Sequence, residues 1–214
     1  MIIGVPAETT EGETRVATIP PVAEDLVEDG HDVLVERGAG EGSDWADEDY
    51  EDVGCEVVDG ADAIYERSDV VFHVQALGNL DDPAPERYRE DQLVVGLLGP
   101  YGVDDATLET LAENGVTAFA LELIPRISRA QSMDALSSMA SIGGYKAAVM
   151  AADDLPELFP MQMTAAGTVR PADVFVVGAG VAGLQAIATA ERLGANVRAY
   201  DIRPEVKEEV ESLG

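Results

Sequence analysis

Cysteine is almost absent from this chain of 214 residues, since Cys55 is the only one. A single thiol can build neither an internal disulfide framework nor a zinc cluster, and we expect no metal site. Long apolar runs are also missing, because none approaches the roughly 18 residues of a membrane helix, and no signal peptide precedes Met1. The sequence therefore predicts a soluble cytoplasmic protein that does not insert into a membrane, with Cys55 as a small core residue.

Basic residues are scarce. The chain has 13 Lys and Arg against 42 Asp and Glu, a net charge of −29, and its only lysines are Lys146 and Lys207. Such a charge excludes nucleic acid and anionic lipid as direct partners. The chain is not expected to be disordered, because 46% of its residues are apolar and the acids are interspersed among them. We interpret the acid-rich, lysine-poor composition as halophilic adaptation to a salty cytoplasm, with no role in catalysis.

The first part of the chain alternates short apolar strands with helices of roughly ten residues. We expect strands at residues 1–6, 31–36, 56–58, 69–75, 92–99 and 116–123, and helices at residues 21–30, 47–53, 61–68 and 104–115. This alternation is typical of an α/β fold, a parallel sheet with helices on both faces. The two histidines fit structural positions, since His31 follows a helix end and His73 lies in the middle of a strand.

A glycine-rich segment organises the second part. The apolar strand 174–177 leads into Gly178-Ala179-Gly180-Val181-Ala182-Gly183, then into a helix that ends at Gly194. A second strand, residues 196–200, ends at Asp201, which is 18 residues beyond Gly183. Such a glycine pattern alone is weak evidence. In this strand–turn–helix–strand–acid context it indicates a dinucleotide-binding site.

Each residue type in this segment answers a physical need. Gly178 permits a tight turn, Gly180 lets a pyrophosphate approach the backbone, and Gly183 allows close packing of helix on strand. Asp201 can accept hydrogen bonds from both hydroxyls of the adenosine ribose and would repel a 2′-phosphate, so NAD(H) is favoured over NADP(H). Arg203 weakens that preference, because an arginine beside the acid can tolerate the phosphate.

A polar cluster opens the segment between the two parts, RISRAQSMDALSSMASIGGYK, residues 126–146. Arg126, Gln131, Asp134 and Ser137 include pairs spaced three apart, which can share one face of a helix. One interpretation is structural, because Ser128-x-x-Gln131 matches a capping box at the start of a long helix. The other is a binding loop. Spacing alone leaves both open.

Three stretches carry a family resemblance. RISRAQSMDALSSMASIGGYKA and GAGVAGLQAIATAERLGANVRAYDIRPEVKEEVESLG closely resemble the NAD(H)-binding alpha subunits of proton-translocating nicotinamide nucleotide transhydrogenases. The N-terminal ETTEGETRVATIPPVAEDLVEDGHDVLVERGAG is similar to the start of the wider family that also contains alanine dehydrogenases. The resemblance covers the whole chain and implies two Rossmann-like α/β domains, residues 1–127 and residues 128–214, joined by a long helix.

The resemblance also implies a site and favours the binding interpretation of the loop. Arg126, Gln131, Asp134 and Ser137 would act in catalysis by orienting the nicotinamide carboxamide and ribose. The positions implied to bind NAD(H) are Arg126, Ile127, Ser128, Gln131, Gly178, Gly180, Val181, Gly183, Asp201, Ile202 and Arg203. The hydride would pass directly to or from NADP(H) held on a partner component, a step that needs no acid, base or metal.

Two departures keep alternatives in view. Alanine dehydrogenases use a lysine and a histidine where this chain has Gln75 and Gly99-Pro100-Tyr101, although Arg15 is present. An amino-acid dehydrogenase of the alanine or saccharopine type is therefore the second choice. The chain ends at Gly214, where a doubly wound domain needs more strands, so we expect a truncated second domain, and a non-catalytic NAD-binding fragment is a third possibility.

The partners implied by the resemblance are a membrane-embedded proton-channel subunit and an NADP(H)-binding subunit, together with a second copy of this chain in a homodimer. The protein would then lie peripheral to the cell membrane through its complex.

Overall fold

The computed structural model describes residues 1–81 and 83–213 and divides the chain into two compact units, Met1–Met133 and Asp134–Gly214. The domain boundary expected from the sequence lies after residue 127. The first compact unit ends at Met133 and so also includes the 3-10 helix η5 (Ser128–Met133).

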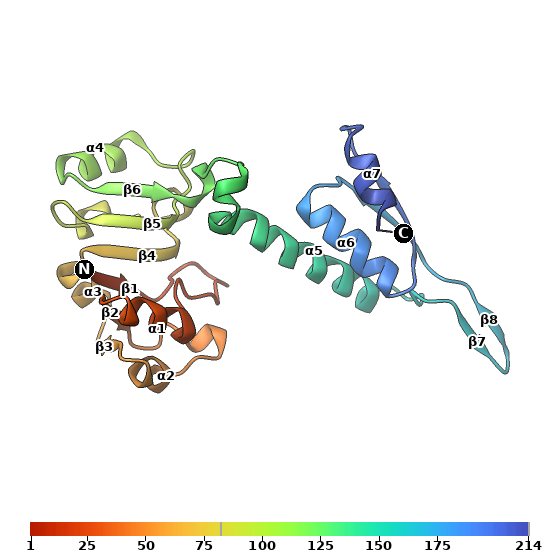
Figure 1. Ribbon diagram of the computed structural model, residues 1–214, viewed down its shortest axis with the longest axis horizontal. Coiled ribbons are helices and arrows are strands. Elements are labelled where there is room, and N and C mark those ends of the chain that lie inside the picture. The colour runs from red at the N-terminus through yellow and green to blue at the C-terminus, as the bar shows by residue number, and fades with distance from the viewer. Residues whose placement is uncertain (82, 214) are drawn as a thin grey trace. The chain divides into compact units, whose positions relative to one another are not determined.

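The first unit contains a six-stranded, fully parallel sheet, as predicted (Figure 1). Its order is β3-β2-β1-β4-β5-β6, so the direction of strand succession reverses beside β1. The strands are β1 (Ile2–Val5), β2 (Asp32–Glu36), β3 (Glu56–Val58), β4 (Val70–Gln75), β5 (Leu93–Leu97) and β6 (Thr117–Ala120).

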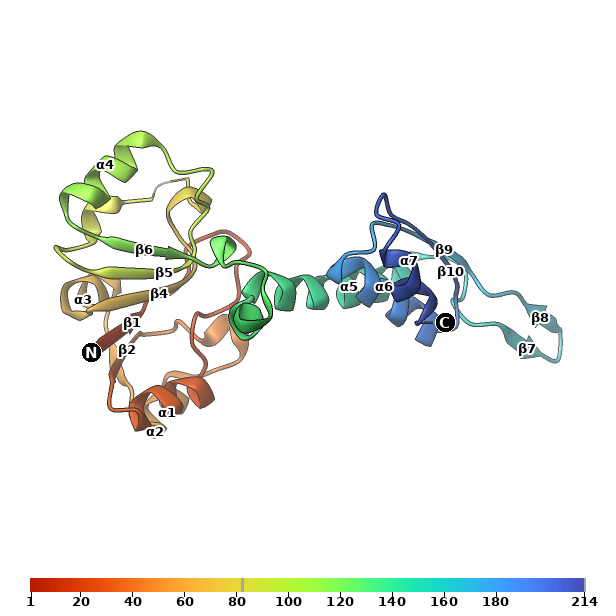
Figure 2. The ribbon, with the colours of Figure 1, turned by 45° about the horizontal axis from the view of Figure 1, so that its top comes forward.

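Helices cover both faces of this sheet, also as predicted (Figure 2). Because side chains alternate along a strand, Val33 and Val35 of β2 pack in one core and Leu34 in another. The first core takes residues from α1 (Pro20–Glu28) and α2 (Asp47–Asp52), and the second from α3 (Ala61–Arg67) and α4 (Asp105–Glu113). Cys55 is 7% exposed and belongs to the first core, which confirms its structural interpretation. Short 3-10 helices connect these elements: η1 (Glu41–Ser43), η2 (Leu77–Asn79), η3 (Pro85–Arg87) and η4 (Leu121–Leu123).

A buried polar network joins β4 to the loop after β1. The Glu8 carboxylate accepts hydrogen bonds from the N–H groups of Val74 and Gln75, at 2.7 and 2.9 Å. His73 Nε2 lies 3.2 Å from the hydroxyls of both Tyr65 and Tyr88. Burial raises the pKa of both phenols, which keeps both hydroxyls protonated. His73 is thus a satisfied core residue, as expected.

The second unit begins with the long helix α5 (Ala135–Asp154) and contains the predicted strand–turn–helix–strand segment. Strands β9 (Asp173–Val177) and β10 (Asn196–Tyr200) pair in parallel, with α6 (Val181–Arg192) between them in sequence and α7 (Val206–Glu211) after them. Its core is built largely of small side chains: Ala148, Phe159, Ala172, Ala190 and Ala195. These side chains let α6 pack closely on the two strands and α5 pack closely on α6.

Two features of this unit were not predicted. Strands β7 (Gln162–Thr164) and β8 (Gly167–Val169) form an antiparallel hairpin whose residues are all exposed, so no apolar alternation marks them in the sequence. Helix α5 also crosses α6 so closely that a side chain on Gly144 would overlap the carbonyl of Ala182. Within the described residues, every helix falls short of the length and hydropathy that crossing a bilayer requires.

Candidate functional site

The glycine turn between β9 and α6 is held by the end of the neighbouring strand β10. The N–H of Gly178 donates to the carbonyl of Tyr200 at 2.7 Å, and the N–H of Ala179 donates to Asp201 Oδ2 at 2.7 Å. Gly178 has a φ of 98°, a backbone conformation that glycine adopts without strain. The acid at the end of β10 therefore lies in hydrogen-bond contact with the turn.

The other two glycines of the pattern have different surroundings. A Cβ on Gly183 would overlap the carbonyl of Gly178, so only glycine lets the first turn of α6 pack beneath the loop. A Cβ on Gly180 would meet no described atom within 4 Å. Folding of this unit does not require glycine at that second position. The open space beside Gly180 is where a ligand can approach the backbone.

At the same place, the first backbone N–H groups of helix α6 have no hydrogen-bond acceptor among the residues that the structure describes. Gly180 is its N-cap and supplies no capping side chain, and the first intrahelical bond is the 2.8 Å one from the Leu184 N–H to the Gly180 carbonyl. The N–H groups of Val181, Ala182 and Gly183 consequently have no acceptor within the helix. Together with the positive end of the helix dipole, they form an arrangement that suits a phosphate or pyrophosphate.

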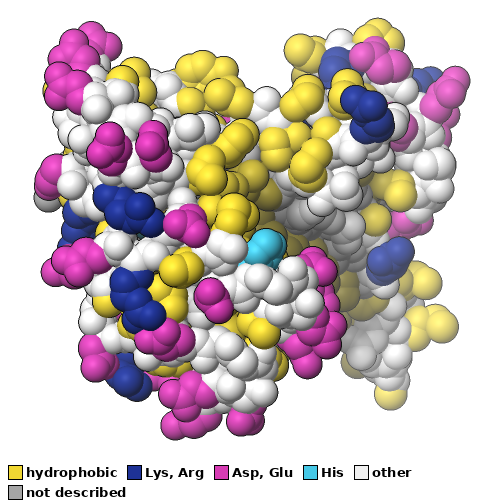
Figure 3. Space-filling view, turned by 60° about the vertical axis from the view of Figure 1, so that its left-hand side comes forward, with side chains coloured by type: hydrophobic (Ala, Val, Ile, Leu, Met, Phe, Trp, Pro, Cys, Tyr) yellow, Lys and Arg dark blue, Asp and Glu magenta, His cyan; other side chains and the backbone are white. Residues whose placement is uncertain are grey.

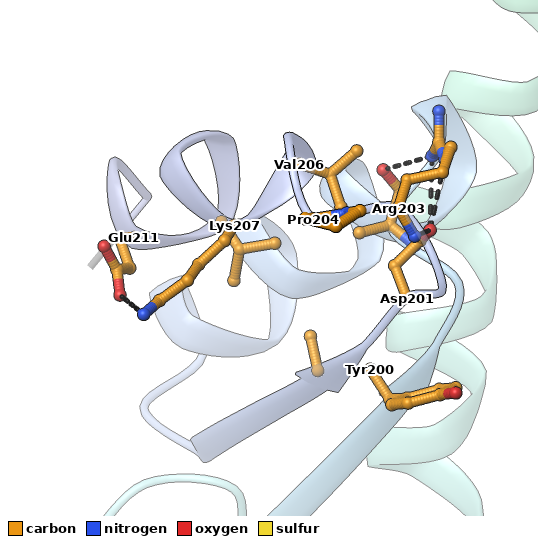
Figure 4. Close-up of a pocket in the computed structure, with 10 residues that line it drawn as sticks. Tyr200, Asp201, Arg203, Pro204, Val206, Lys207 and Glu211 are labelled. Carbon is orange, nitrogen blue, oxygen red and sulfur yellow. Dashed lines mark hydrogen bonds and ion pairs between the residues drawn. The ribbon is translucent and has the colours of Figure 1, made fainter.

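Asp201 is ionised and densely hydrogen-bonded (Figure 4). Its Oδ1 accepts from the Arg203 backbone N–H at 2.8 Å and from Arg203 Nε at 3.1 Å. Its Oδ2 accepts from Arg203 Nη2 at 3.2 Å as well as from Ala179. The Arg203 guanidinium, followed by the backbone N–H groups of Arg203 and Ala179, holds the pKa of Asp201 far below its usual range.

A cavity of about 440 Å³ adjoins this acid, a size in the usual range of roughly 300–1,000 Å³ for ligand pockets. Its lining comes from the glycine turn, β10 and α7 (Figure 4): Ala179, Ala199, Tyr200, Asp201, Arg203, Pro204, Val206, Lys207, Val210 and Glu211. Asp201 and Arg203 were predicted from the sequence. Ala179 was not, although it stands between the first two glycines of the pattern. Ile202, named as cofactor-binding, is 84% exposed and does not line the cavity.

The residues of the polar loop are divided between the two units. Arg126, Ile127, Ser128 and Gln131 are exposed on the first unit, the last two of them in η5, whereas Asp134 and Ser137 open α5 in the second. Exposure leaves the first four available to a ligand.

The capping interpretation of this loop applies to other residues than expected. Asp134 is the N-cap of α5, with Oδ1 accepting from the Ser137 N–H at 2.9 Å and Oδ2 from the Ser137 hydroxyl at 2.7 Å. The box that the spacing of Ser128 and Gln131 suggested as one interpretation does not cap this helix, because those residues lie in η5 before it starts. An aspartate ahead of an apolar helical run was the sequence signal for the true cap.

Both parts of the chain match models of one family. Residues 4–143 match the N-terminal domain described as alanine dehydrogenase/PNT, and residues 147–214 match the C-terminal domain of the same name.

Individual proteins agree with that match. The NAD(P) transhydrogenase subunit alpha of Cereibacter sphaeroides is 46% identical over 214 residues, covering 100% of this chain and 40% of the relative. A crystal structure of transhydrogenase from Sinorhizobium meliloti superposes with a TM-score of 0.92 at 45% identity, covering 100% of this chain and 63% of that one. A structure of L-alanine dehydrogenase gives a TM-score of 0.82 at 31% identity, with 100% and 58% covered.

This chain thus spans between 40% and 63% of the length of these three proteins. The two domain models are matched in order, and the likeness to the transhydrogenases extends over every residue of the chain. The chain therefore belongs to the alanine dehydrogenase/transhydrogenase (PNT) family.

Proposed function

We propose that this chain is the NAD(H)-binding component of a proton-translocating transhydrogenase, in which a hydride passes between NAD(H) on this chain and NADP(H) on a partner component. The observation that carries the proposal is the contact of Asp201 with the glycine turn, beside the free amides of α6. The greater likeness to transhydrogenases than to alanine dehydrogenase supports the choice of reaction.

The residues of the second unit fit an NAD(H) dinucleotide. The amides of Val181 to Gly183 receive the pyrophosphate, and the open space at Gly180 lets it come close to the backbone. Asp201 accepts the two hydroxyls of the adenosine ribose. Because its lowered pKa keeps it negatively charged, it disfavours the 2′-phosphate of NADP(H).

The polar loop is assigned to the nicotinamide end. When bound, the nicotinamide supplies the hydride chemistry, and the chain has to orient the ring and exclude water. Arg126 and Gln131 supply side chains for the carboxamide and ribose, with backbone from Ile127 and Ser128. Asp134 and Ser137 are engaged with each other, so their contribution is to fix the start of α5 immediately after that loop.

Amino-acid dehydrogenation is the weaker alternative. Glu13 holds Arg15 through two bonds, from Nε at 2.8 Å and from Nη2 at 2.6 Å, and also accepts from Gln75 Nε2 at 2.7 Å. The Arg15 guanidinium lowers the pKa of Glu13 to about 2, so Glu13 is negatively charged at neutral pH and neutralises Arg15. An amino-acid carboxylate would have to displace Glu13, and Gln75 offers no positive charge in compensation. A non-catalytic NAD-binding module would share the nucleotide site but lack hydride transfer.

The assembly follows from the same proposal. The partners are a membrane-embedded proton-channel subunit and an NADP(H)-binding subunit, with this chain as a homodimer that reaches the cell membrane only through them.

Three measurements test this function. Titration of NADH fluorescence should show binding to the protein with a clear preference for NADH over NADPH, and equal affinities would contradict the role of Asp201. Reconstitution with an NADP(H)-binding component should give reduction of an NAD analogue by NADPH. Alanine with NAD alone should give no NADH. Turnover with alanine in the absence of any partner would instead establish the dehydrogenase.

A matched pair of glycine variants tests the site itself. Gly180→Ala adds a methyl group to open space, so it should leave the melting temperature unchanged while weakening NADH binding. Gly183→Ala forces an overlap with the Gly178 carbonyl and should lower both the melting temperature and the affinity for NADH. Unchanged NADH affinity in Gly180→Ala would place the pyrophosphate elsewhere.

A further inference from the structure

Every acceptor position of Asp201 is filled by the chain itself. An ionised carboxylate offers about four lone-pair positions, two on each oxygen. Four N–H donors use them: Ala179 N and Arg203 Nη2 on Oδ2, and Arg203 N and Nε on Oδ1. A ribose diol that donates both hydroxyls to this acid therefore has to displace some of these donors.

The four donors differ in how firmly they are held. The two backbone N–H groups lie at 2.7 and 2.8 Å and belong to the glycine turn and the chain after β10. The two guanidinium donors are longer, at 3.1 and 3.2 Å, and come from a side chain that is 49% exposed. The guanidinium is thus the part that can leave, because a backbone donor cannot move without distorting the turn.

The guanidinium donors are placed one on each oxygen, Nε on Oδ1 and Nη2 on Oδ2. Their departure frees one acceptor position on each oxygen. Two adjacent ribose hydroxyls need one free acceptor position on each oxygen. The bonds from the backbone N–H groups of Ala179 and Arg203 remain and keep the carboxylate against the turn. The other cation of the cavity, Lys207, pairs with Glu211 at 3.5 Å (Figure 4).

We propose that Arg203 determines cofactor specificity through a displaceable latch. The latch consists of the bonds of its guanidinium to Asp201 and to the Ala179 carbonyl. The adenosine ribose diol of NAD(H) replaces these bonds when the cofactor binds. This inference rests on the proposed NAD(H)-binding function. The latch opposes NAD(H) binding because its bonds must break first. The released guanidinium remains near the ribose, since the Arg203 backbone stays bonded to Asp201, and it can then attract a 2′-phosphate.

Arg203 consequently narrows the preference for NAD(H) in two ways. Its removal frees Asp201 for the diol and deletes the positive charge that suits NADP(H). We expect Arg203→Ala to bind NADH about twofold to fivefold more tightly, the size expected for loss of an exposed ion pair, and to bind NADPH more weakly. The measurement is best made in about 1 M salt, where the Debye length of about 3 Å screens the general attraction of a cation for an anionic nucleotide.

Two controls isolate the latch. Lys207→Ala removes a cation that lines the same cavity but, among the described residues, bonds to Glu211 instead of Asp201, and it should leave the ratio of NADH to NADPH affinities unchanged. An NADH analogue whose adenosine ribose lacks both hydroxyls has no need to displace the guanidinium. Its affinity should be the same for wild type and Arg203→Ala.

A measurement on the wild-type protein avoids dependence on any variant. The nitrogen resonance of Arg203 Nε should shift when NADH is added and stay in place with the dideoxy analogue. Weaker binding of NADH by Arg203→Ala, an unchanged affinity, or an Nε resonance that ignores NADH would overturn the latch. Failure of the folded wild type to bind NADH at all would instead overturn the proposed function.

Discussion

At the scale of single residues, Asp201 combines two tasks. It fixes the glycine turn through the Ala179 N–H, and it is the proposed acceptor of the adenosine ribose. Both tasks require the ionised carboxylate, which the neighbouring Arg203 and backbone N–H groups keep at a low pKa. The cofactor preference of the chain therefore depends on a small group of residues whose hydrogen bonds compete.

Replacement of this acid should reduce discrimination between the two cofactors. In Asp201→Ala the ribose hydroxyls lose their acceptor and a 2′-phosphate loses its repulsion, so the ratio of NADPH to NADH dissociation constants should fall about tenfold, as for loss of a hydrogen bond to a charged group. Fluorescence titration with both cofactors measures it. The ratio in Asp201→Asn, which keeps one side-chain oxygen, should lie between the ratios of wild type and Asp201→Ala. An unaltered ratio in Asp201→Ala would refute Asp201 as the acceptor of the ribose hydroxyls.

Glu13 gives a prediction for pH. The Arg15 guanidinium, opposed in part by burial, lowers its pKa from 4.5 to about 2 in the folded chain. A carboxylate with a lowered folded-state pKa stabilises the fold above its ordinary pKa, and this stabilisation is lost as the pH falls from about 4.5 to about 2. The difference in unfolding free energy between wild type and Glu13→Gln, from urea titration, should be largest near neutral pH and shrink toward pH 2. In an Arg15→Ala background that pH dependence should largely disappear; its persistence would exclude Arg15 as the cause.

At the scale of elements, the contact between α5 and α6 depends on one glycine of an adjacent pair. A Cβ on Gly144 would overlap backbone atoms of Ala182, whereas a Cβ on Gly143 meets no described atom within 4 Å. Gly144→Ala should lower the unfolding free energy by about 1–3 kcal/mol, the usual range for overpacking. Gly143→Ala should raise it by about 0.5–1 kcal/mol, because alanine favours a helix over glycine. Equal effects in chemical denaturation would mean that the two helices are not in close contact.

Substitutions at the start of α5 and just before it should separate effects on stability from effects on activity. Asp134→Ala removes the N-cap and should cost about 0.5–2 kcal/mol of unfolding free energy. Gln131→Ala removes an exposed side chain of η5, so stability should hold while turnover in the reconstituted complex falls about 100-fold through misplaced rings. NADH affinity should weaken less than turnover, because the contacts at Gly180 and Asp201 remain. Near-normal turnover of Gln131→Ala would leave the loop with a structural role only.

At the scale of the whole molecule, the main feature is the excess of acidic side chains over basic ones. Asp and Glu side chains are spread over the face shown in Figure 3, with hydrophobic side chains between them. Most of the 42 acids lie outside the ion pairs found among the described residues. At a net charge of −29, the acidic side chains therefore repel one another.

Salt should stabilise such a molecule. The Debye length falls from about 30 Å at 0.01 M to about 3 Å at 1 M, so the self-repulsion of the acids should fade and the melting temperature should rise steeply into the molar range of potassium chloride. Thermal unfolding followed by circular dichroism gives the curve. A flat or falling curve between about 0.1 and 2 M salt would contradict the proposed halophilic adaptation and reopen a functional role for the acids.

The amino-acid sequence by itself determined the alternation of strands and helices, the parallel sheet and the glycine turn followed by Asp201. These features were readable because each depends on neighbouring residues: apolar periodicity marks the strand and helix faces, and glycines mark the turns. The core roles of Cys55 and His73 were predicted in the same way, Cys55 from its place at the start of an expected strand and His73 from its place in the middle of one.

Only the tertiary structure decided which residues meet across the chain. Glycine is required at position 144 because α6 crosses α5 there. The hairpin β7–β8 went unpredicted because its exposed residues carry no pattern of burial. The saturation of Asp201 by Ala179 and Arg203 depends on β10 ending beside the turn that follows β9. Contacts between distant residues depend on how the elements pack, and local residue patterns do not encode that packing.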